Sequence, residues 1–149
     1  MIQKVRNEIR EEYGISDTLE FAHIAVSFYD TWFTRGHASQ IGVGCVIDIL
    51  TGYVIDYEVM SKHSTDCEYA KTVLGGKSAE YLIWFDSHKT SCSINNTGTS
   101  GTMERAAAYK LWYRSGKMGF RYTTILSNGD AKAFNYLKEK NIYGADTEI

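Results

Sequence analysis

The sequence has no proline among its 149 residues, no stretch rich in glycine and serine, and no internal repeat. Linkers between domains are usually exposed and rich in such residues, so the sequence offers no place to divide it. Its length is enough for one domain with a real core and too short for two. We therefore expect a single domain over residues 1–149.

Long apolar runs and secretion signals are also missing. No stretch approaches about 18 apolar residues, the length that a membrane-spanning helix requires. Residues 1–14 are charged and helical in pattern, unlike the apolar centre of a secretory signal. These two absences predict an intracellular protein that neither enters a membrane nor is secreted.

Strongly basic segments are absent as well. The formal net charge is −2 at pH 7, and lysine and arginine form no long run. A domain that holds DNA by its phosphates usually carries a basic stripe, so this charge speaks against strong DNA binding by the chain alone. The scattered candidates for phosphate contact are Arg35, Lys62, Lys132 and Lys138, and a solvated surface is their other interpretation.

Cysteine is scarce. The three cysteines, Cys45, Cys67 and Cys92, are an odd number and cannot complete a disulfide framework. In an intracellular chain such cysteines are free thiols or metal ligands. The rest of the composition, with 44% hydrophobic and 23% charged residues, is ordinary for a globular protein and argues against disorder.

Three segments predict strands near the start of the chain. Residues 24–29, 43–50 and 53–60 are rich in β-branched and aromatic residues. The second and third segments flank Thr51-Gly52, which predicts a hairpin with a two-residue turn. We therefore expect the three strands to form an antiparallel meander.

The remainder alternates between helical and loop patterns. The expected elements are a polar helix at 5–12, loops at 61–76 and 91–101, helices at 78–88 (with Ser78 as N-cap) and 103–115, a fourth strand at 121–127 and a last helix at 131–140. This order predicts an α/β domain with a mixed sheet, in which a three-strand meander is followed by α-β-α. Residues 1–20 form a helical extension, and residues 61–101 form an insertion.

Four blocks of residues resemble those of animal-type Mutator-like transposases. The first block, residues 26–39, is similar to a family pattern in which a strand is followed by Asp-Gly-Thr-Trp, two residues and Arg-Gly. The others, in the family's order and spacing, are residues 51–62, 88–104 and 121–134, so that the resemblance covers residues 24–144. The resemblance implies a ribonuclease-H-like fold and metal-dependent cutting and joining of DNA.

The resemblance also implies which residues form the site. Transposases of this family use three acids to hold divalent ions such as Mg²⁺ or Mn²⁺, which clamp the attacking and leaving oxygens of a phosphodiester. The matching blocks offer Asp30 and Asp130 as catalytic acids. The residues implied to line the site are Tyr29, Trp32, Arg35, Glu104 and Asn128.

This chain departs from the family pattern at both acids. The family's Asp-Gly aligns with Tyr29-Asp30, so that a tyrosine stands at the acid position. Because successive strand residues point to opposite faces, we expect the Asp30 carboxylate to turn away unless the strand ends there. The family's Asp-Gly-Asp reads Asn128-Gly129-Asp130 here, and an amide brings a metal no charge.

The remaining family features lead to further expectations. The third acid and the His-bearing block before it would follow Ile149, so we expect a truncated copy, incomplete at the C-terminus and weak or inactive as a catalyst. Structural roles stay open for the acids that are present. Asp30 suits a turn, Asp130 suits an N-cap, and Glu104 suits the dipole at a helix start.

A zinc site follows from the same resemblance. Animal members often carry Cys-x2-Cys after the third strand and then His-x3-Cys, four ligands that suit tetrahedral Zn²⁺. Ser64 stands where one of the first two cysteines would be. The candidate ligands are therefore Cys67, His88 and Cys92, with His63 or Asp66 as the fourth. The other interpretation is a free Cys67, a packed Cys92 and a surface His88.

Two functions remain open at this point. One is a transposase-derived domain with impaired chemistry, which acts on transposon ends in the nucleus (otherwise in the cytoplasm) and forms homo-oligomers through other regions. The other is a non-catalytic module that binds DNA or protein and is stabilised by zinc; a poorly folding relic is a third outcome. The tryptophans and the eleven tyrosines can stack on bases, although core packing explains most of them.

Overall fold

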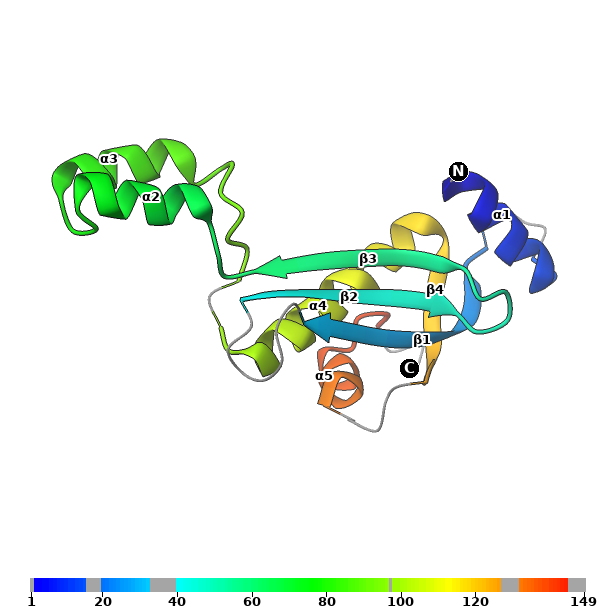
Figure 1. Ribbon diagram of the computed structural model, residues 1–149. Helices are drawn as coiled ribbons and strands as arrows, with labels where there is room; N and C mark the ends of the chain where they lie inside the picture. The colour runs from blue at the N-terminus through cyan, green and yellow to red at the C-terminus, as the bar shows by residue number, and fades with distance from the viewer. Residues whose placement is uncertain (1, 16–19, 33–39, 97, 127–131, 145–149) are drawn as a thin grey trace.

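The computed structural model describes residues 2–15, 20–32, 40–96, 98–126 and 132–144. Its centre is a four-stranded mixed sheet in the order β3-β2-β1-β4 (Figure 1). The strands are β1 (Ala22–Trp32), β2 (Ile41–Asp48), β3 (Val54–Ser61) and β4 (Phe120–Leu126). All four predicted strands are present, and the sheet with its helices forms a mixed α/β domain.

The first three strands form the predicted antiparallel meander. β1 pairs with β2, and β2 pairs with β3, each in antiparallel register. β4 lies parallel to β1 on the other side, and its last residue, Leu126, is level with Ser27. β1 is longer than the predicted segment, because it continues through Asp30, which pairs with Gly44 of β2. The alternation of side chains between the two faces therefore extends through Asp30.

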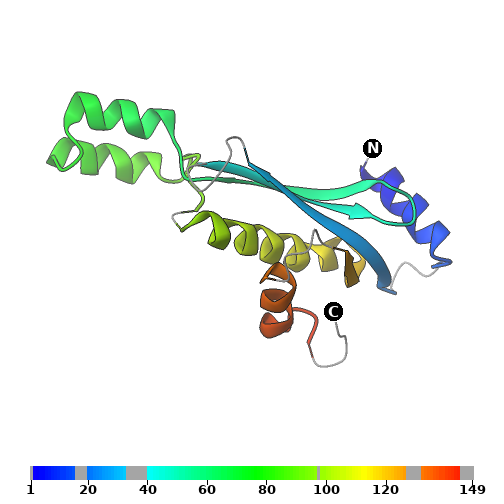
Figure 2. The same cartoon turned by 60° about the horizontal axis from the view of Figure 1, so that its bottom comes forward.

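Helices cover one face of the sheet and extend beyond its ends (Figure 1). They are α1 (Ile2–Glu12), α2 (Thr65–Leu74), α3 (Ala79–His88), α4 (Ser100–Ser115), η1 (Gly116–Met118, a 3-10 turn) and α5 (Lys132–Lys140). In Figure 2, α4 runs along one face of the sheet and α5 lies against α4. The hairpin of α2 and α3, which we call the arm, projects past the strands in both views. None of the described helices is both long and apolar enough to cross a membrane.

The core lies between the sheet and α4. Every second residue of β2 is buried, and β1 alternates in the same way, so that Val26 and Phe28 face α4. Trp112 of α4 is fully buried, and its ring meets the Phe28 ring edge-on with 5.9 Å between centroids. Its Nε1 donates a hydrogen bond to the Tyr122 carbonyl at 3.2 Å. Burying an aromatic side chain of this size contributes on the order of 3 kcal/mol.

The expectation of a loop over residues 61–76 is wrong, because residues 65–74 form α2. The Ser64 hydroxyl caps this helix by accepting a hydrogen bond from the Cys67 backbone N–H at 3.2 Å. Asp66 and Glu68 lie in the first turn, where negative charge favours the helix dipole. The polar composition that indicated a loop therefore belongs to a short capped helix on the surface.

The connection between β2 and β3 is longer than the predicted two-residue turn, because β2 ends at Asp48 and β3 begins at Val54. Asp48 is fully buried and organises this connection. Its carboxylate accepts hydrogen bonds from the Thr51 backbone N–H at 2.8 Å, the Thr51 hydroxyl at 2.6 Å and the Tyr13 hydroxyl at 2.9 Å. A buried carboxylate needs several partners, and the longer loop supplies them.

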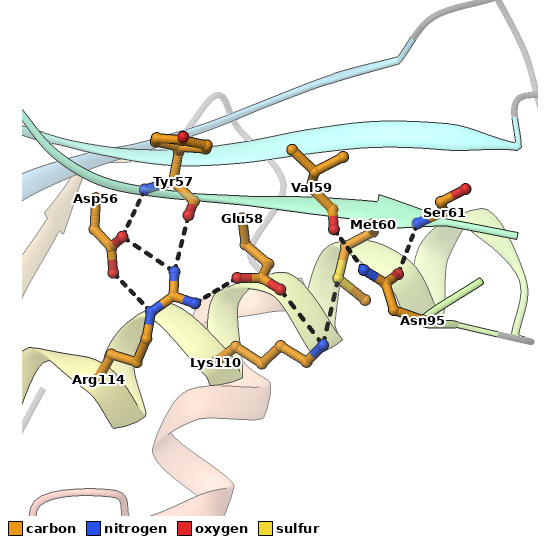
Figure 3. A network of polar contacts seen from close by, with 9 residues as sticks. All are labelled: Asp56, Tyr57, Glu58, Val59, Met60, Ser61, Asn95, Lys110 and Arg114. Carbon is orange, nitrogen blue, oxygen red and sulfur yellow. Dashed lines mark hydrogen bonds and ion pairs between the residues drawn. The ribbon is translucent and has the colours of Figure 1, made fainter. Parts of the chain in front are cut away.

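Ion pairs join α4 to the edge strand β3 (Figure 3). The Arg114 guanidinium bonds to both carboxylate oxygens of Asp56, at 3.0 and 3.1 Å, and also contacts Glu58. Lys110, one turn earlier on α4, lies 3.5 Å from Glu58. Because two-pronged arginine–carboxylate pairs have a defined geometry, these contacts hold α4 in one rotation about its axis.

Gly44 marks the point where α4 comes closest to the sheet. A Cβ atom at Gly44 would lie 3.2 Å from the Ala107 Cβ and 3.2 Å from the Phe28 ring. We expect Gly44→Ala to lower the free energy of unfolding by about 1–3 kcal/mol, because the packed helix has to shift. Urea unfolding followed by circular dichroism measures this loss. Gly116→Ala is the control, since among the described residues nothing lies within 4 Å of that Cβ; equal losses would contradict the close approach.

Candidate functional site

Asp30 and Tyr29 lie on opposite faces of the sheet. Tyr29 is 50% exposed, whereas Asp30 is partly buried and continues the series of Val26 and Phe28 toward α4. The strand does not end before Asp30. The carboxylate of Asp30 stands one residue after the family's acid position. It therefore lies on the helix-covered face of the sheet, away from the face on which Tyr29 lies.

The other residues implied for the acid site are described only in part. Glu104 lies in the first half of α4 and is partly buried. Trp32 is the last residue of β1, and its side chain lies outside the described part of the structure, as do Arg35, Asn128 and Asp130. β4 ends level with Ser27 and runs parallel to β1. The chain therefore leaves β4 toward the same end of the sheet as Asp30.

Two thiols and an imidazole meet where the arm joins the domain. Cys67 lies in the first turn of α2, His88 is the last residue of α3, and Cys92 lies in the segment that returns to the sheet. One ligand atom of each lies within 4.8 Å of the other two, and the two sulfur atoms are 3.6 Å apart. The fold thus brings together three of the predicted ligands, a donor set that suits Zn²⁺.

The three donor atoms have different surroundings. Burial raises the pKa of the Cys67 thiol, whereas a hydrogen bond from the Ile94 backbone N–H lowers the pKa of the Cys92 thiol. The His88 Nε2 atom is buried and has no hydrogen-bond partner among the described residues. The His88 ring stacks on Trp84 with 4.5 Å between centroids. Because a buried ring nitrogen without a partner is costly, a bound cation would relieve it.

His63 does not belong to this group. Its Nε2 atom lies 3.5 Å from the Thr65 hydroxyl, and its backbone carbonyl accepts hydrogen bonds from Ser61 and Ser93. Asp66, the other candidate, is exposed and lines a cavity of about 430 Å³ together with His88.

Ser64 has a structural role beside the Cys67 thiol that the sequence did not predict. Ser64 is 3% exposed, and its hydroxyl accepts a hydrogen bond from the Cys67 backbone N–H at 3.2 Å. The signal for this position was present in the sequence, because a serine three residues before Cys67 and ahead of two acidic residues is a typical helix N-cap. Because the sequence did not predict this helix, Ser64 was interpreted only as a residue that replaces a cysteine ligand.

Hydrogen bonds of asparagine residues hold the return segment against β3 (Figure 3). The Asn95 side chain accepts a hydrogen bond from the Ser61 N–H at 2.7 Å and donates one to the Val59 carbonyl at 2.7 Å. The backbone N–H groups of Asn95 and Asn96 donate to the Ser61 carbonyl at 2.9 and 3.2 Å. The two ends of the arm are therefore held side by side, which keeps Cys67 and Cys92 within reach of each other.

A known protein family matches the whole chain. The family model of Mutator-like transposases matches residues 1–149, and so includes the sheet, the arm and all four sequence blocks. No curated protein and no solved structure matches the chain.

The three thiols of the metal-free protein should react at different rates. We expect Cys92 to be alkylated by iodoacetamide before Cys67 at pH 7, because its lowered pKa leaves more thiolate and its side chain is partly exposed. Burial and the nearby Asp30 carboxylate raise the pKa of Cys45, so its rate should increase only at higher pH. Peptide mass spectrometry over a pH series measures the order. Alkylation of Cys67 ahead of Cys92 would contradict the arrangement.

Proposed function

This chain belongs to the Mutator-like transposase family, and from that premise we propose that it is a transposase-derived domain that acts on DNA with impaired phosphodiester chemistry. The family supplies the class of partner, which is DNA, and hence a place in the nucleus. The impairment is inferred from residues of this chain, and the sheet supplies the framework on which they lie.

The strand topology supports a ribonuclease-H-like framework. Three antiparallel strands are followed by the arm, by α4 and then by a strand that is parallel to the first. In such a sheet the acids come from the first strand and from the end of the fourth. Asp30 lies in β1, and Asp130 follows β4 by four residues in the sequence.

The observation that carries the proposal is the course of β1 through Asp30. It directs the carboxylate to the face covered by α4, the helix that carries Glu104. Asp130 comes two residues before α5, which packs against α4. Asp30 and Glu104 are thus associated with one helical layer, and Asp130 is close to that layer in the sequence. Their oxygen atoms are the ligands that Mg²⁺ and Mn²⁺ prefer, and such ions stabilise the charge that develops on a phosphodiester during its cleavage.

The impairment follows from the two substituted acid positions. Tyr29 stands at the family's acid position and offers no carboxylate, and the Asp30 carboxylate beside it points to the other face of the sheet. Asn128 offers an oxygen atom but no negative charge. Because a divalent cation is held mainly by charge, each substitution weakens its binding and therefore the rate. We infer weak or absent cleavage under conditions in which a complete set of acids would act.

The second candidate function is a non-catalytic binding module whose arm is stabilised by zinc. The convergence of Cys67, His88 and Cys92 favours it. These residues fit Zn²⁺, because the buried His88 Nε2 atom lacks a partner among the described residues and a hydrogen bond from the Ile94 backbone N–H lowers the pKa of the Cys92 thiol. The two candidates are compatible, since zinc in the arm leaves the acid site unchanged.

Restoring one carboxylate tests the impairment. We expect Asn128→Asp to increase the nicking of supercoiled plasmid in Mn²⁺ by about tenfold or more, because the added charge strengthens cation binding. Gel electrophoresis of the plasmid over time measures the rate. Adding Asp30→Asn to this variant should remove the gain.

Asp86→Asn is the matched control for that experiment, because Asp86 is an exposed carboxylate on the arm. It should leave nicking unchanged. Wild-type protein that already cleaves at the rate of Asn128→Asp would show that the chemistry is not impaired. Nicking that survives Asp130→Ala would show that the acids are assigned incorrectly.

Zinc content tests the second candidate. After dialysis against buffered zinc, we expect about one ion per chain in the wild type and background levels in His88→Gln and Cys92→Ser, since each change removes a ligand. Inductively coupled plasma mass spectrometry measures the content. Cys45→Ser is the control, because Cys45 lies in β2 outside the group, and it should retain the ion. Equal zinc content in all four proteins would rule out the site.

A further inference from the structure

A cavity of about 640 Å³ opens beside α4, between the segment that returns from the arm and α5. Its walls include Asn96, Gly98, Thr102, Arg105, Ala106 and Tyr136. Its volume lies within the range of about 300–1,000 Å³ that is usual for pockets that bind small ligands. Of the residues that the structure describes, neither Asp30 and Glu104 nor the Cys67, His88 and Cys92 group line it, so it needs an explanation of its own.

The cavity combines an aromatic ring with positive charge. Two cations lie near the Tyr136 ring, with the Arg105 guanidinium carbon 5.7 Å and the Lys140 Nζ atom 5.4 Å from its centroid. The edge of the Tyr109 ring meets it at 6.4 Å between centroids. α5 carries three lysines and one glutamate, although the net charge of the whole chain is −2. Alternating rings and cations are typical of surfaces that bind single nucleic-acid strands.

The cavity also lies next to the proposed acid site. Ala106 lines the cavity, while the next residue, Ala107, packs against the position of Gly44, which is the partner of Asp30. The cavity and Asp30 therefore flank the same turns of α4. An α-helix with its side chains is about 10–12 Å across, and a DNA strand advances about 3.4 Å per nucleotide in a duplex and further when it is unpaired. About three nucleotides are enough to pass from one to the other.

We propose that this cavity binds unpaired nucleotides of a DNA strand that flank the phosphodiester at Asp30. Tyr136 stacks on a base, and Arg105 neutralises a phosphate. This inference rests on the proposed function, because the family is what makes DNA the occupant. It adds that the bound segment is single-stranded, since the faces of bases are covered in a duplex and are available to a tyrosine ring only when unpaired.

Fluorescence anisotropy with the full chain tests the proposal. The probe is a labelled oligothymidylate of about 12 nucleotides, titrated over a series of salt concentrations. We expect it to bind more tightly than a duplex of the same length. Tyr136→Ala should weaken binding about tenfold or more, whereas Tyr136→Phe, which keeps the ring, should bind like the wild type. Arg105→Gln should reduce the slope of log K against log salt by about 0.7, the loss of one phosphate contact.

The controls separate binding from folding. Tyr69→Ala removes an exposed tyrosine from α2, outside the cavity, and should bind like the wild type. Thermal unfolding shows whether Tyr136→Ala remains folded. If it does not, the salt slope of Arg105→Gln decides, because that change leaves the α5 side chains intact.

The outcomes distinguish this inference from the function on which it rests. Wild-type protein that binds no DNA of either form would overturn the proposed function and this inference together. Binding that Tyr136→Ala and Arg105→Gln leave unchanged would overturn only the cavity as the site. A preference for the duplex, or for an oligouridylate competitor over the oligothymidylate, would overturn the identity of the occupant.

Discussion

The close approach of α4 to the sheet is the contact on which the rest of the molecule depends. It is possible because Gly44 has no side chain, so that Ala107 and the Phe28 ring fill the space where a Cβ atom would be. Trp112 then reaches the core and meets both Phe28 and Tyr122 edge-on. Arg114 and Lys110 of the same helix pair with Asp56 and Glu58 of β3. Packing thereby fixes the distance of α4 from the sheet, and the ion pairs fix its rotation about its own axis.

The fixed position of α4 determines which part of the protein each of its faces contacts. The face toward the sheet closes the core and lies over Asp30. The neighbouring face, with Thr102, Arg105 and Ala106, forms one wall of the cavity that Tyr136 completes. A strand that threads from the cavity to the acid would therefore follow the surface of a single rigid element. Sites on rigid elements keep their geometry better than sites on loops.

The arm presents a different physical problem, because it has almost no core of its own. In α2 and α3 the only buried residues are Cys67, Ala70 and Tyr81. Units this small usually need a metal or a disulfide to be stable. The thiols of Cys67 and Cys92 and the ring of His88 gather at the base of the arm, where one ion would join both of its helices. The arm thus leaves Tyr69, Val73, Leu82 and Ile83 exposed, and an ion at its base would compensate for the apolar contacts that it lacks.

Much of the domain was determined by local sequence. The apolar alternation of three segments predicted the meander, Ser78 predicted the start of α3, and the order of the blocks predicted the family. Those signals depend on neighbours in the chain, so they can be read without a fold. The loop predicted over residues 61–76 was wrong because a short polar helix capped by Ser64 has no apolar period to reveal it. The hairpin predicted across Thr51-Gly52 is present, but the predicted two-residue length of its turn was wrong, because the connection is built around the buried Asp48, whose partner Tyr13 is distant in the sequence.

Tertiary structure alone decided the direction of Asp30, the ligand group and the cavity. The sequence placed Asp30 one residue from the family's acid, but only the pairing of β1 with Gly44 showed that the strand continues and which face the carboxylate meets. Cys67 and Cys92 were candidate ligands from their spacing, yet their sulfur atoms meet because hydrogen bonds of Asn95 bring the two ends of the arm together. Arg105 and Tyr136 are 31 residues apart and carry no shared motif. The sequence therefore determined the elements and the family, because these follow from local pattern; the fold decided the sites, because each depends on contacts between segments that are remote in the chain.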